Sequence, residues 1–259
     1  IRGVEIMLSA NAIDNKDFKW NVATNWSTAR QYYAKLDPDY SKDDLWTKKG
    51  ARKDVYTARK LMTAPDGQLI HDGSGLPIRS SYYSKIGYTD PDWNWGLINT
   101  FNYKRFTLTL SIDGRIGGHT SSTTESYMWD AGVHPDSDNQ WRYDEVVNGL
   151  KNYNVGGVQV ASGEAKYDKY GNITSDTRVF TPNTTGASYQ SYVQRWTSGP
   201  QFILDETFLK LRELSITYDI PTNFAKKLGM TSASISAIGQ NLFLWSKDFK
   251  YTDPDRAKD

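Results

Sequence analysis

Apolar and polar residues alternate along six stretches of the chain. In the clearest of them, residues 105–117, every second side chain from Phe106 to Ile112 is apolar, and those between them are Thr or Ser. A period of two places the apolar side chains on one face of a β-strand and the polar side chains on the other. The same pattern recurs elsewhere, so the sequence predicts an all-β chain with strands near 3–13, 18–30, 93–103, 105–117, 207–220 and 232–245.

The lengths of the strands and of their connections favour a membrane barrel. Each predicted strand has about ten residues, the length at which a tilted strand crosses a bilayer. Short turns close the hairpins, whereas the segments 31–92 and 118–206 are long and show no sustained periodicity. Outer-membrane barrels have short periplasmic turns and long extracellular loops. We therefore predict a transmembrane, antiparallel up-and-down β-barrel segment whose two long loops are extracellular.

A soluble β-sandwich is the alternative fold, because it also buries one face of each strand. Three features favour the barrel. The centres of the apolar faces carry no charge, the opposite faces are rich in Asn, Ser and Thr, and aromatic residues lie near the strand ends. These aromatic residues are Phe18, Trp20, Trp26, Trp93, Trp95, Tyr103, Phe106 and Tyr218.

The fifth predicted strand contains a change of phase. Leu209 and Leu211 alternate out of step with the apolar residues that begin at Leu214. Either a bulge near Glu213 shifts the register, or the two leucines point inward onto packed protein.

Composition excludes several classes of protein. The chain has 259 residues, and no run of about eighteen apolar residues occurs in it, so a transmembrane helix is not expected. A net charge of +1 provides no electrostatic reason to expect nucleic acid. Cysteine is absent, which removes disulfides and thiol chemistry from this chain. The aromatic share of 14% suits interfacial aromatic bands or the stacking of a ligand.

Several of these stretches resemble one family. FLKLRELSITYDIPTNFAKKLGM (208–230) and ISAIGQNLFLWSK (235–247) resemble the C-terminal signature of SusC/RagA-type TonB-linked outer-membrane transporters. DPDWNWGLINTFNYKRFTLTLSIDGRIGG resembles the preceding hairpin of that family, and GVEIMLSANAI with FKWNVATNWS resembles the hairpin before it. The resemblance covers the six predicted strands and none of the long loops.

The resemblance implies that the chain is the C-terminal part of a plugged barrel of about 22 strands in the outer membrane of a Gram-negative bacterium. Such proteins import large nutrients, usually oligosaccharides and sometimes oligopeptides. They use energy delivered through the TonB complex and a SusD-like surface lipoprotein as an extracellular lid. A TonB box, a plug, a carboxypeptidase-like extension and a final strand ending in an aromatic residue are not found in the sequence. We therefore expect a fragment that lacks the plug and N-terminal domains.

The polar faces of the strands would line the lumen of such a barrel. Their uncharged donors and acceptors could exchange hydrogen bonds with a hydroxyl-rich or amide-rich solute, or with the plug and one another. Asp113 and Arg115 lie on the same face and could contact the substrate or form an ion pair that faces the plug. The other predicted lumen-facing residues are Asn21, Asn25, Asn94, Thr107, Thr109, Ser111, Ser215, Thr217 and Gln240.

Aromatic residues in the long loops are the candidate cargo contacts. They could stack on sugar rings or on peptide side chains, pack the loops together, or form the interface with the lid. The candidates are Trp46, Trp129, Trp141, Tyr143 and Trp196.

Catalysis has no support in the sequence. His71, His119 and His134 lie in loops without the spacing of metal ligands, so we expect no enzyme, no metal centre and no cofactor. A calcium ion in a loop is possible, because two clusters of mostly acidic residues offer oxygen ligands. Neither cluster has the EF-hand pattern. The clusters are Asp37, Asp39, Asp43 and Asp44, and Asp168, Asn172 and Asp176.

Two other functions compete with active import. A passive outer-membrane porin would need no plug and would lack the IPTNFAKKLG and GQNLF segments. A soluble β-rich carbohydrate-binding module would remain in the aqueous fraction without detergent.

Overall fold

The computed structural model describes residues 1–41 and 44–255, which form two compact units. The sheet unit comprises residues 1–34, 90–119 and 205–250. The loop unit comprises residues 35–89 and 120–204, with a last segment that starts at Tyr251. The two long connections predicted from the sequence thus supply most of a unit of their own.

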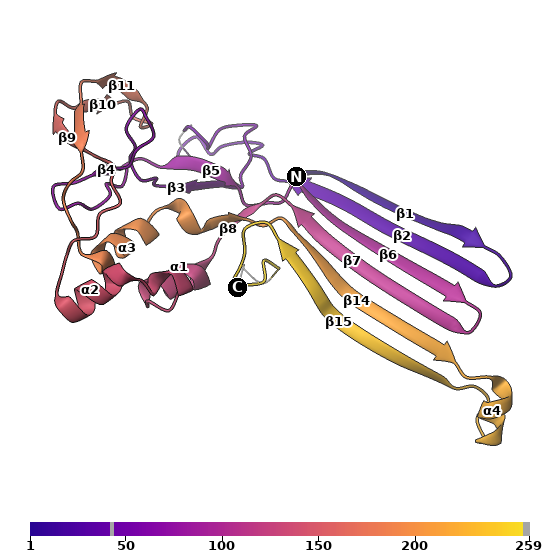
Figure 1. Ribbon diagram of the computed structural model, residues 1–259. Helices are drawn as coiled ribbons and strands as arrows, with labels where there is room; N and C mark the ends of the chain where they lie inside the picture. Colours follow the sequence, from indigo (N-terminus) through magenta and orange to yellow (C-terminus); the bar gives the residue numbers. More distant parts are fainter. Residues whose placement is uncertain (42–43, 256–259) are drawn as a thin grey trace. The chain divides into compact units, whose positions relative to one another are not determined.

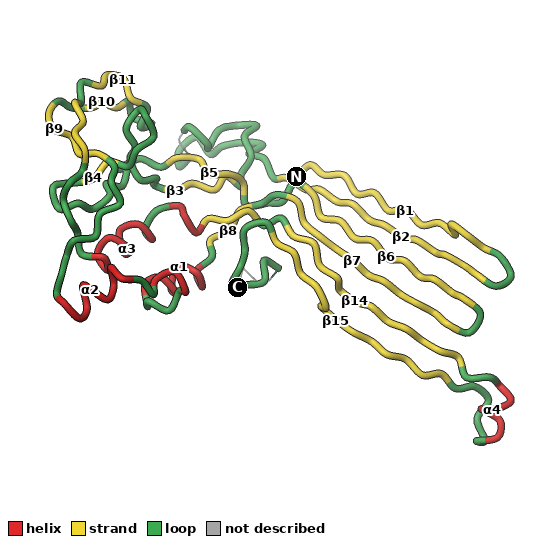
Figure 2. The backbone as a smooth tube through the Cα atoms, in the orientation of Figure 1, coloured by secondary structure: helices red, strands yellow, loops and turns green. Residues whose placement is uncertain are grey.

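The sheet unit is a six-stranded antiparallel meander (Figure 1). Its strands, in spatial order, are β1 (Arg2–Asp14), β2 (Phe18–Arg30), β6 (Trp93–Tyr103), β7 (Phe106–Ile116), β14 (Phe208–Asp219) and β15 (Ser234–Ser246). Figure 2 shows the six long strands lying side by side and joined at one end by short connections. Strands β1 and β15 are the two edges, so the described residues form an open sheet and no closed barrel.

The short connections follow from local turn chemistry. Between β1 and β2, the Oδ1 atom of Asn15 accepts the N–H groups of Asp17 and Phe18, a common way for Asn to stabilise a reversal. Between β6 and β7, Lys104 has a φ of 52°, the left-handed conformation that a two-residue hairpin loop requires. The third connection contains a short helix, α4 (Thr222–Lys227), after Pro221.

A bulge resolves the change of phase in β14. The register with β7 shifts between Leu211 and Glu213, so Arg212 is the extra residue. Leu211 then lies opposite Ile112, and Leu214 lies opposite Leu110, on the same face of the sheet. The bulge interpretation is therefore confirmed, and the alternative, in which the leucines point to the other side, is wrong.

The loop unit is built from short elements. Its paired strands are β3 (Val55–Ala58) with β5 (Ser84–Tyr88), β10 (Ala165–Tyr167) with β11 (Ile173–Asp176), and the three-stranded sheet of β12 (Val179–Pro182), β9 (Val158–Ser162) and β4 (Ile70–His71). The helices are α1 (Thr123–Asp130), α2 (Gln140–Asn148) and α3 (Tyr189–Thr197), with 3-10 turns at η1 (Pro135–Ser137) and η2 (Pro200–Phe202). Strands β8 (His119–Ser121) and β13 (Ile203–Asp205) form a separate pair.

The two long connections interlock within the loop unit. Strand β4 of the first pairs in parallel with β9 of the second, and Ile70 lies opposite Val158. Both side chains are buried together with Ala64, so the unit has a small apolar core of its own. No helix of the described residues is both long and apolar enough to cross a lipid bilayer.

Candidate transport face and loop groove

The pairing register places most of the apolar side chains of the six strands on one face of the sheet, called the apolar face here, while Met7, Ile98, Ile238 and Leu244 lie on the other face. Leu110, near its centre, lies opposite Leu214 on one side and Asn99 on the other. Asn99 is the one buried polar residue in this row, and its Oδ1 atom accepts the indole N–H of Trp20 at 3.0 Å. The apolar face comprises Ile6, Leu8, Ala10, Ile13, Trp20, Val22, Trp26, Trp95, Leu97, Phe101, Leu108, Leu110, Ile112, Leu211, Leu214, Ile216, Ala237 and Phe243.

Aromatic rows border this face at two levels. Near the short turns, Tyr103, Phe106 and Tyr218 are direct cross-strand neighbours, and the rings of Phe106 and Tyr218 lie 4.8 Å apart. Eight residues further along β7, Trp95 lies opposite Gly114 and stacks on Trp26 at 5.7 Å. Eight residues of strand span roughly 27 Å along the strand, or roughly 20 Å across the membrane at the usual tilt of about 40°, and the apolar band of outer-membrane barrels is about 25 Å tall.

Gly114 leaves room for the indole ring of Trp95 in the second aromatic row. A Cβ atom at this position would lie 2.7 Å from Cζ2 of Trp95 and 2.5 Å from the carbonyl oxygen of Phe208. The indole can cross β7 here because the strand has no side chain at this point.

The opposite, polar face carries the nine uncharged residues predicted to line a lumen. Thr109 lies opposite Thr100 and Ser215, and Thr107 lies opposite Thr217. Some of them bond other polar residues of the same face, as Thr217 Oγ1 lies 2.8 Å from Ser236 Oγ and Thr107 donates to Asn102. The same register places Asn21, Asn25, Asn94, Ser111 and Gln240 on this face. That this face borders a lumen stays a prediction.

Asp113 and Arg115 form ion pairs with other residues instead of with each other. Both carboxylate oxygens of Asp113 accept from Nε of Arg212 at 2.8 Å, and Nη1 of Arg115 donates to Oε2 of Glu206 at 2.6 Å. The expectation of an Asp113–Arg115 pair is therefore wrong. Sequence reasoning missed both partners, which lie 99 and 91 residues away in the chain.

Aromatic side chains of the loop unit line a groove of about 510 Å³. Three of the predicted cargo residues, Trp129, Trp141 and Trp196, line it. Among the described residues, neither Trp46 nor Tyr143 lines this groove or makes a ring contact with those that do. The whole lining consists of Leu69, Trp129, Asp136, Asn139, Trp141, Tyr153, Asn154, Val155, Tyr189, Tyr192, Val193 and Trp196.

Helix caps position the aromatic residues of the groove. Ser122 caps α1, which carries Trp129, and Ser188 caps α3, which carries Trp196. The Oδ1 atom of Asn139 accepts the N–H of Arg142 and starts α2 just before Trp141. Such caps satisfy backbone donors at a helix start and define where the helix begins.

Three tyrosines complete the groove and were not among the predicted site residues. Tyr153 makes edge contacts with both Tyr189 and Tyr192 at 5.0 Å, and with Trp141 at 5.6 Å. A signal for two of them exists in the sequence, because Tyr189, Tyr192 and Val193 have the i, i+3, i+4 spacing of a buried helix face.

Burial changes the acid–base properties of the groove. The hydroxyl of Tyr192 lies 3.2 Å from Nε2 of His71, whose side chain is also buried. Burial raises the pKa of Tyr192 to about 12 and also raises the pKa of Tyr153, because an anionic phenolate is poorly solvated there. Burial likewise lowers the pKa of His71.

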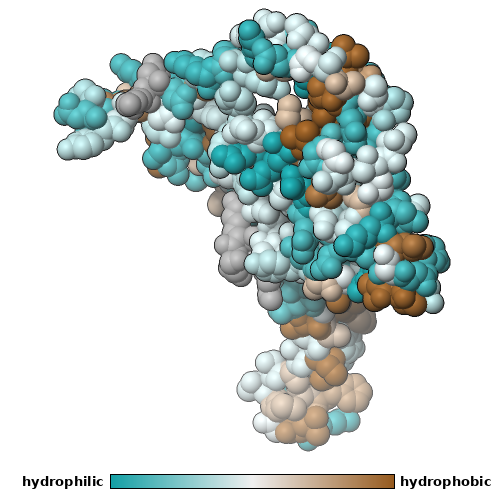
Figure 3. All heavy atoms as spheres, turned by 90° about the vertical axis from the view of Figure 1, so that its left-hand side faces the viewer, coloured by the Kyte–Doolittle hydropathy of each residue, from teal (hydrophilic) through white to brown (hydrophobic). Residues whose placement is uncertain are grey.

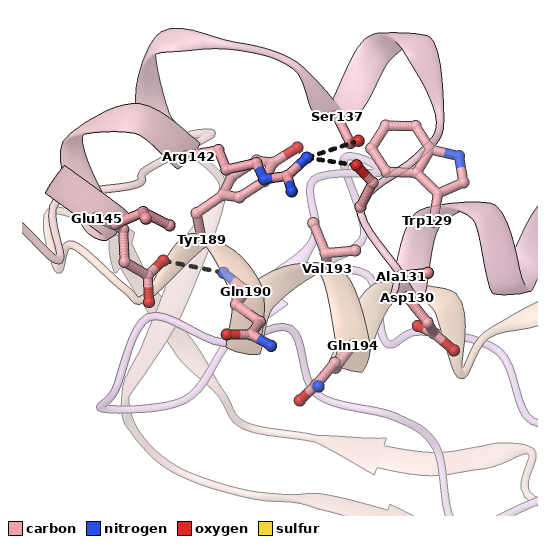
Figure 4. Close-up of a pocket in the computed structure, with 12 residues that line it drawn as sticks. Trp129, Asp130, Ala131, Ser137, Arg142, Glu145, Tyr189, Gln190, Val193 and Gln194 are labelled. Atoms are coloured by element: carbon pink, nitrogen blue, oxygen red, sulfur yellow. Dashed lines mark hydrogen bonds between the residues drawn. The ribbon is translucent and has the colours of Figure 1, made fainter.

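A smaller cavity of about 170 Å³ lies among α1, α2 and α3 (Figure 4). Its charged side chains serve helix packing. Nη1 of Arg142 donates to the carbonyl oxygen of Gly132 and, at 3.5 Å, to Ser137 Oγ. The Glu145 carboxylate accepts from the N–H of Gln190 at 3.0 Å.

Several of the acidic side chains that could ligate calcium instead accept hydrogen bonds within their own turns. Asp168 accepts from Asn172 and from the N–H of Tyr170, and Asp176 pairs with Arg178 at 2.7 Å, which lowers the pKa of Asp176 to about 2. Asp37 accepts backbone N–H groups of its own turn, while Asp43 lies outside the described residues. Within residues 1–41 and 44–255, no group of three or more His, Asp or Glu side chains could hold a metal ion.

The loop unit is expected to lose stability in alkali through Tyr192. Because the pKa of this phenol is about 12 in the folded protein and about 10 when unfolded, its contribution is complete below pH 10 and disappears as the pH rises towards 12. A titration of tyrosinate absorbance should show a late step near pH 12 that is missing in Tyr192→Phe. The same step should persist in Tyr143→Phe, and its persistence in Tyr192→Phe would contradict the assignment.

Known proteins include similar sequences and similar folds. No protein-family model matches the chain. The TonB-dependent receptor P3 of Formosa agariphila is 23% identical over 290 residues, which cover 98% of this chain and 25% of the receptor. The chain thus spans about a quarter of the length of the curated relative it matches.

Solved structures of the RagAB peptide transporter have the same fold over the matching region. The transporter structure has a TM-score of 0.58 at 16% identity and covers 98% of this chain and 26% of that chain. The importer in its open-open state has a TM-score of 0.59, and in its closed-closed state 0.56. The SusC/RagA resemblance is thereby confirmed, and the chain is a distant homologue of TonB-dependent receptors with the fold of about a quarter of the RagAB transporter chain.

Proposed function

We propose that the six strands are the C-terminal part of a closed, plugged barrel of about 22 strands in the outer membrane. The observation that carries this proposal is the apolar face, which has no charged residue between its two aromatic rows. Edge strands β1 and β15 support it as well, because their unpaired backbone groups would need partner strands in a lipid environment.

The barrel would serve TonB-dependent import of large nutrients. The polar face would then line the lumen, where hydroxyl and amide side chains are suited to a hydrated solute or to a plug. The Arg212–Asp113 pair joins β14 to β7, and Arg115 of β7 pairs with Glu206, which lies just before β14. Energy coupling would require the TonB complex and would act through parts of the protein outside this chain.

The groove of the loop unit would contact the cargo. Oligosaccharides and oligopeptides both stack on aromatic rings, and likeness to structures described as a peptide transporter and a peptide importer supports the peptide. The single acidic side chain in the groove, Asp136, is exposed and would suit a basic group of such a peptide.

A SusD-like surface lipoprotein is the proposed lid. Helix α2 turns Arg142 and Glu145 to its own unit and leaves Val146 and Val147 exposed, the reverse of an ordinary surface helix, and Leu150 just after the helix is exposed as well. The face drawn in Figure 3 carries several apolar patches on a mostly hydrophilic surface. Exposed apolar patches are typical of protein contacts.

Uptake by cells that produce the full-length protein tests the proposal. Import of a labelled oligopeptide should need TonB, and Trp141→Ala should lower cargo affinity about tenfold, because a ring contact and its buried area contribute on the order of 1–2 kcal/mol. Tyr143→Ala is the matched control, since Tyr143 lies on the same helix but outside the groove.

Three outcomes would contradict parts of this scheme. Uptake that continues without TonB would favour a passive porin. A full-length protein that stays in the aqueous fraction without detergent would favour a soluble carbohydrate-binding module. Equal affinities for Trp129→Ala, Trp141→Ala and the unchanged protein would remove the groove from cargo binding.

A further inference from the structure

The connection between β14 and β15 exposes large apolar side chains. Phe224 in α4 is 61% exposed and Leu228 is 72% exposed, while the small Ala225 is fully buried. Phe224 and Leu228 are four residues apart and therefore lie on the same side of the turn. Met230 follows and is also exposed. In water, a short surface helix would normally turn these apolar residues inward.

This exposure belongs to a well-defined turn. The carbonyl oxygen of Pro221 accepts the N–H groups of Phe224 at 2.8 Å and Ala225 at 3.2 Å. The N–H of Met230 returns to the carbonyl oxygen of Ala225 at 3.0 Å, and Gly229 has a φ of 75°, which allows this reversal. The backbone is thus wrapped around Ala225, and the larger side chains are directed outward.

The turn lies next to the aromatic row at the short-turn end of the sheet. Asp219 donates its N–H to the carbonyl oxygen of Arg105, and the preceding residue, Tyr218, contacts Phe106 in that row. Figure 1 shows α4 at the tip of the β14–β15 hairpin. Only a few residues separate α4 from the row, so it lies at the depth where lipid headgroups would meet a membrane-spanning sheet.

Basic side chains accompany the exposed apolar ones. Lys226 and Lys227 are exposed on α4, and Nζ of Lys227 lies 5.6 Å from the ring centroid of Phe224. The neighbouring turn contributes exposed Lys104 and Arg105 at the same end of the sheet. Phe and Leu beside lysines are the combination found in helices that lie in a membrane interface.

We propose that α4 is an interfacial anchor for anionic phospholipid on the side of the membrane that the short turns face. Phe224, Leu228 and Met230 enter the boundary between headgroups and acyl chains, and Lys226 with Lys227 bind headgroup phosphates. The proposal rests on the proposed function in that the apolar face of the sheet contacts lipid. Continuity with the aromatic row and the paired lysines favour lipid over a protein partner.

Spin labels on the full-length protein in vesicles test the anchor. This chain contains no cysteine, so Phe224→Cys or Leu228→Cys introduces its one thiol. In vesicles containing phosphatidylglycerol, labels at both positions should collide several-fold more with oxygen than with a water-soluble nickel complex. A label at exposed Thr222 on the same helix should show the reverse ratio, and one at Ile216 on the apolar face reports whether the sheet itself contacts lipid.

The possible results distinguish the anchor proposal from the barrel proposal. Lipid contact at 216 together with water contact at 224 and 228 would overturn the anchor and leave the barrel intact, whereas water contact at 216 would overturn both. Shielding of 224 and 228 from both reagents would indicate a protein partner instead. Lys226→Gln with Lys227→Gln should reduce the lipid contact at 228 in phosphatidylglycerol more than in phosphatidylcholine, and an equal effect would overturn the headgroup contact.

Discussion

Leu110→Arg is expected to prevent most of the full-length protein from assembling in the outer membrane. Leu110 lies midway between the two aromatic rows, at the proposed centre of the bilayer. A charged arginine on the lipid face costs about 2–4 kcal/mol at that depth and less near the interfaces. Heat-modifiable migration on gels, together with the amount recovered in the outer-membrane fraction, measures the folded share.

Thr109→Arg is the matched control for this substitution. Thr109 is the preceding residue of β7 and lies on the polar face, opposite Thr100 and Ser215. The same charge at this position should leave assembly nearly unchanged, because the lumen of such a barrel is wet. Equal assembly of the two variants would contradict the assignment of the faces and, with it, the membrane location.

Glu206→Gln is expected to destabilise the folded protein by about 3 kcal/mol. The Glu206 side chain is completely buried and its partner Arg115 is only 18% exposed, so the neutral variant leaves a largely buried guanidinium without its counter-charge. Removal of one member of a buried pair usually costs about 3–5 kcal/mol, and the partial exposure of Arg115 favours the lower end. Thermal or denaturant unfolding of the purified protein measures the loss.

Two further variants test whether the lost stability comes from the buried ion pair. Glu164→Gln removes a carboxylate that is 71% exposed and lies 3.6 Å from Lys166, so it should change stability by less than about 1 kcal/mol. Arg115→Met combined with Glu206→Gln should recover part of the loss, because no buried charge is left unpaired. A change in Glu206→Gln as small as that in Glu164→Gln would show that the pair does not stabilise the fold.

These ion pairs show where sequence reasoning reached its limit in the sheet. Alternation identifies Asp113 and Arg115 as neighbours on the polar face, since that property depends only on the period of a strand. Their partners depend on which strands pair and in which register. The bulge at Arg212 is such a case, because one extra residue changes the face of every side chain beyond it.

The candidate groove shows the same limit in the loop unit. The sequence identifies Trp129, Trp141 and Trp196 as aromatic loop residues, but nothing local distinguishes them from Trp46, which lies outside the groove. The parallel pairing of β4 with β9 and the ring contacts of Tyr153 with Tyr189 and Tyr192 select the members of the site.

By itself, the sequence determined where the six long strands run and which residues share a face within each uninterrupted stretch, because the alternation of side chains along a strand is a local property. It also determined the short turns, through residues such as Asn15 that satisfy their own backbone. The tertiary structure alone decided the register across the β14 bulge, the partners of the buried charges and the assembly of two distant connections into one groove. Those features arise from contacts between residues far apart in the chain, whose free energies depend on burial and geometry that no local pattern contains.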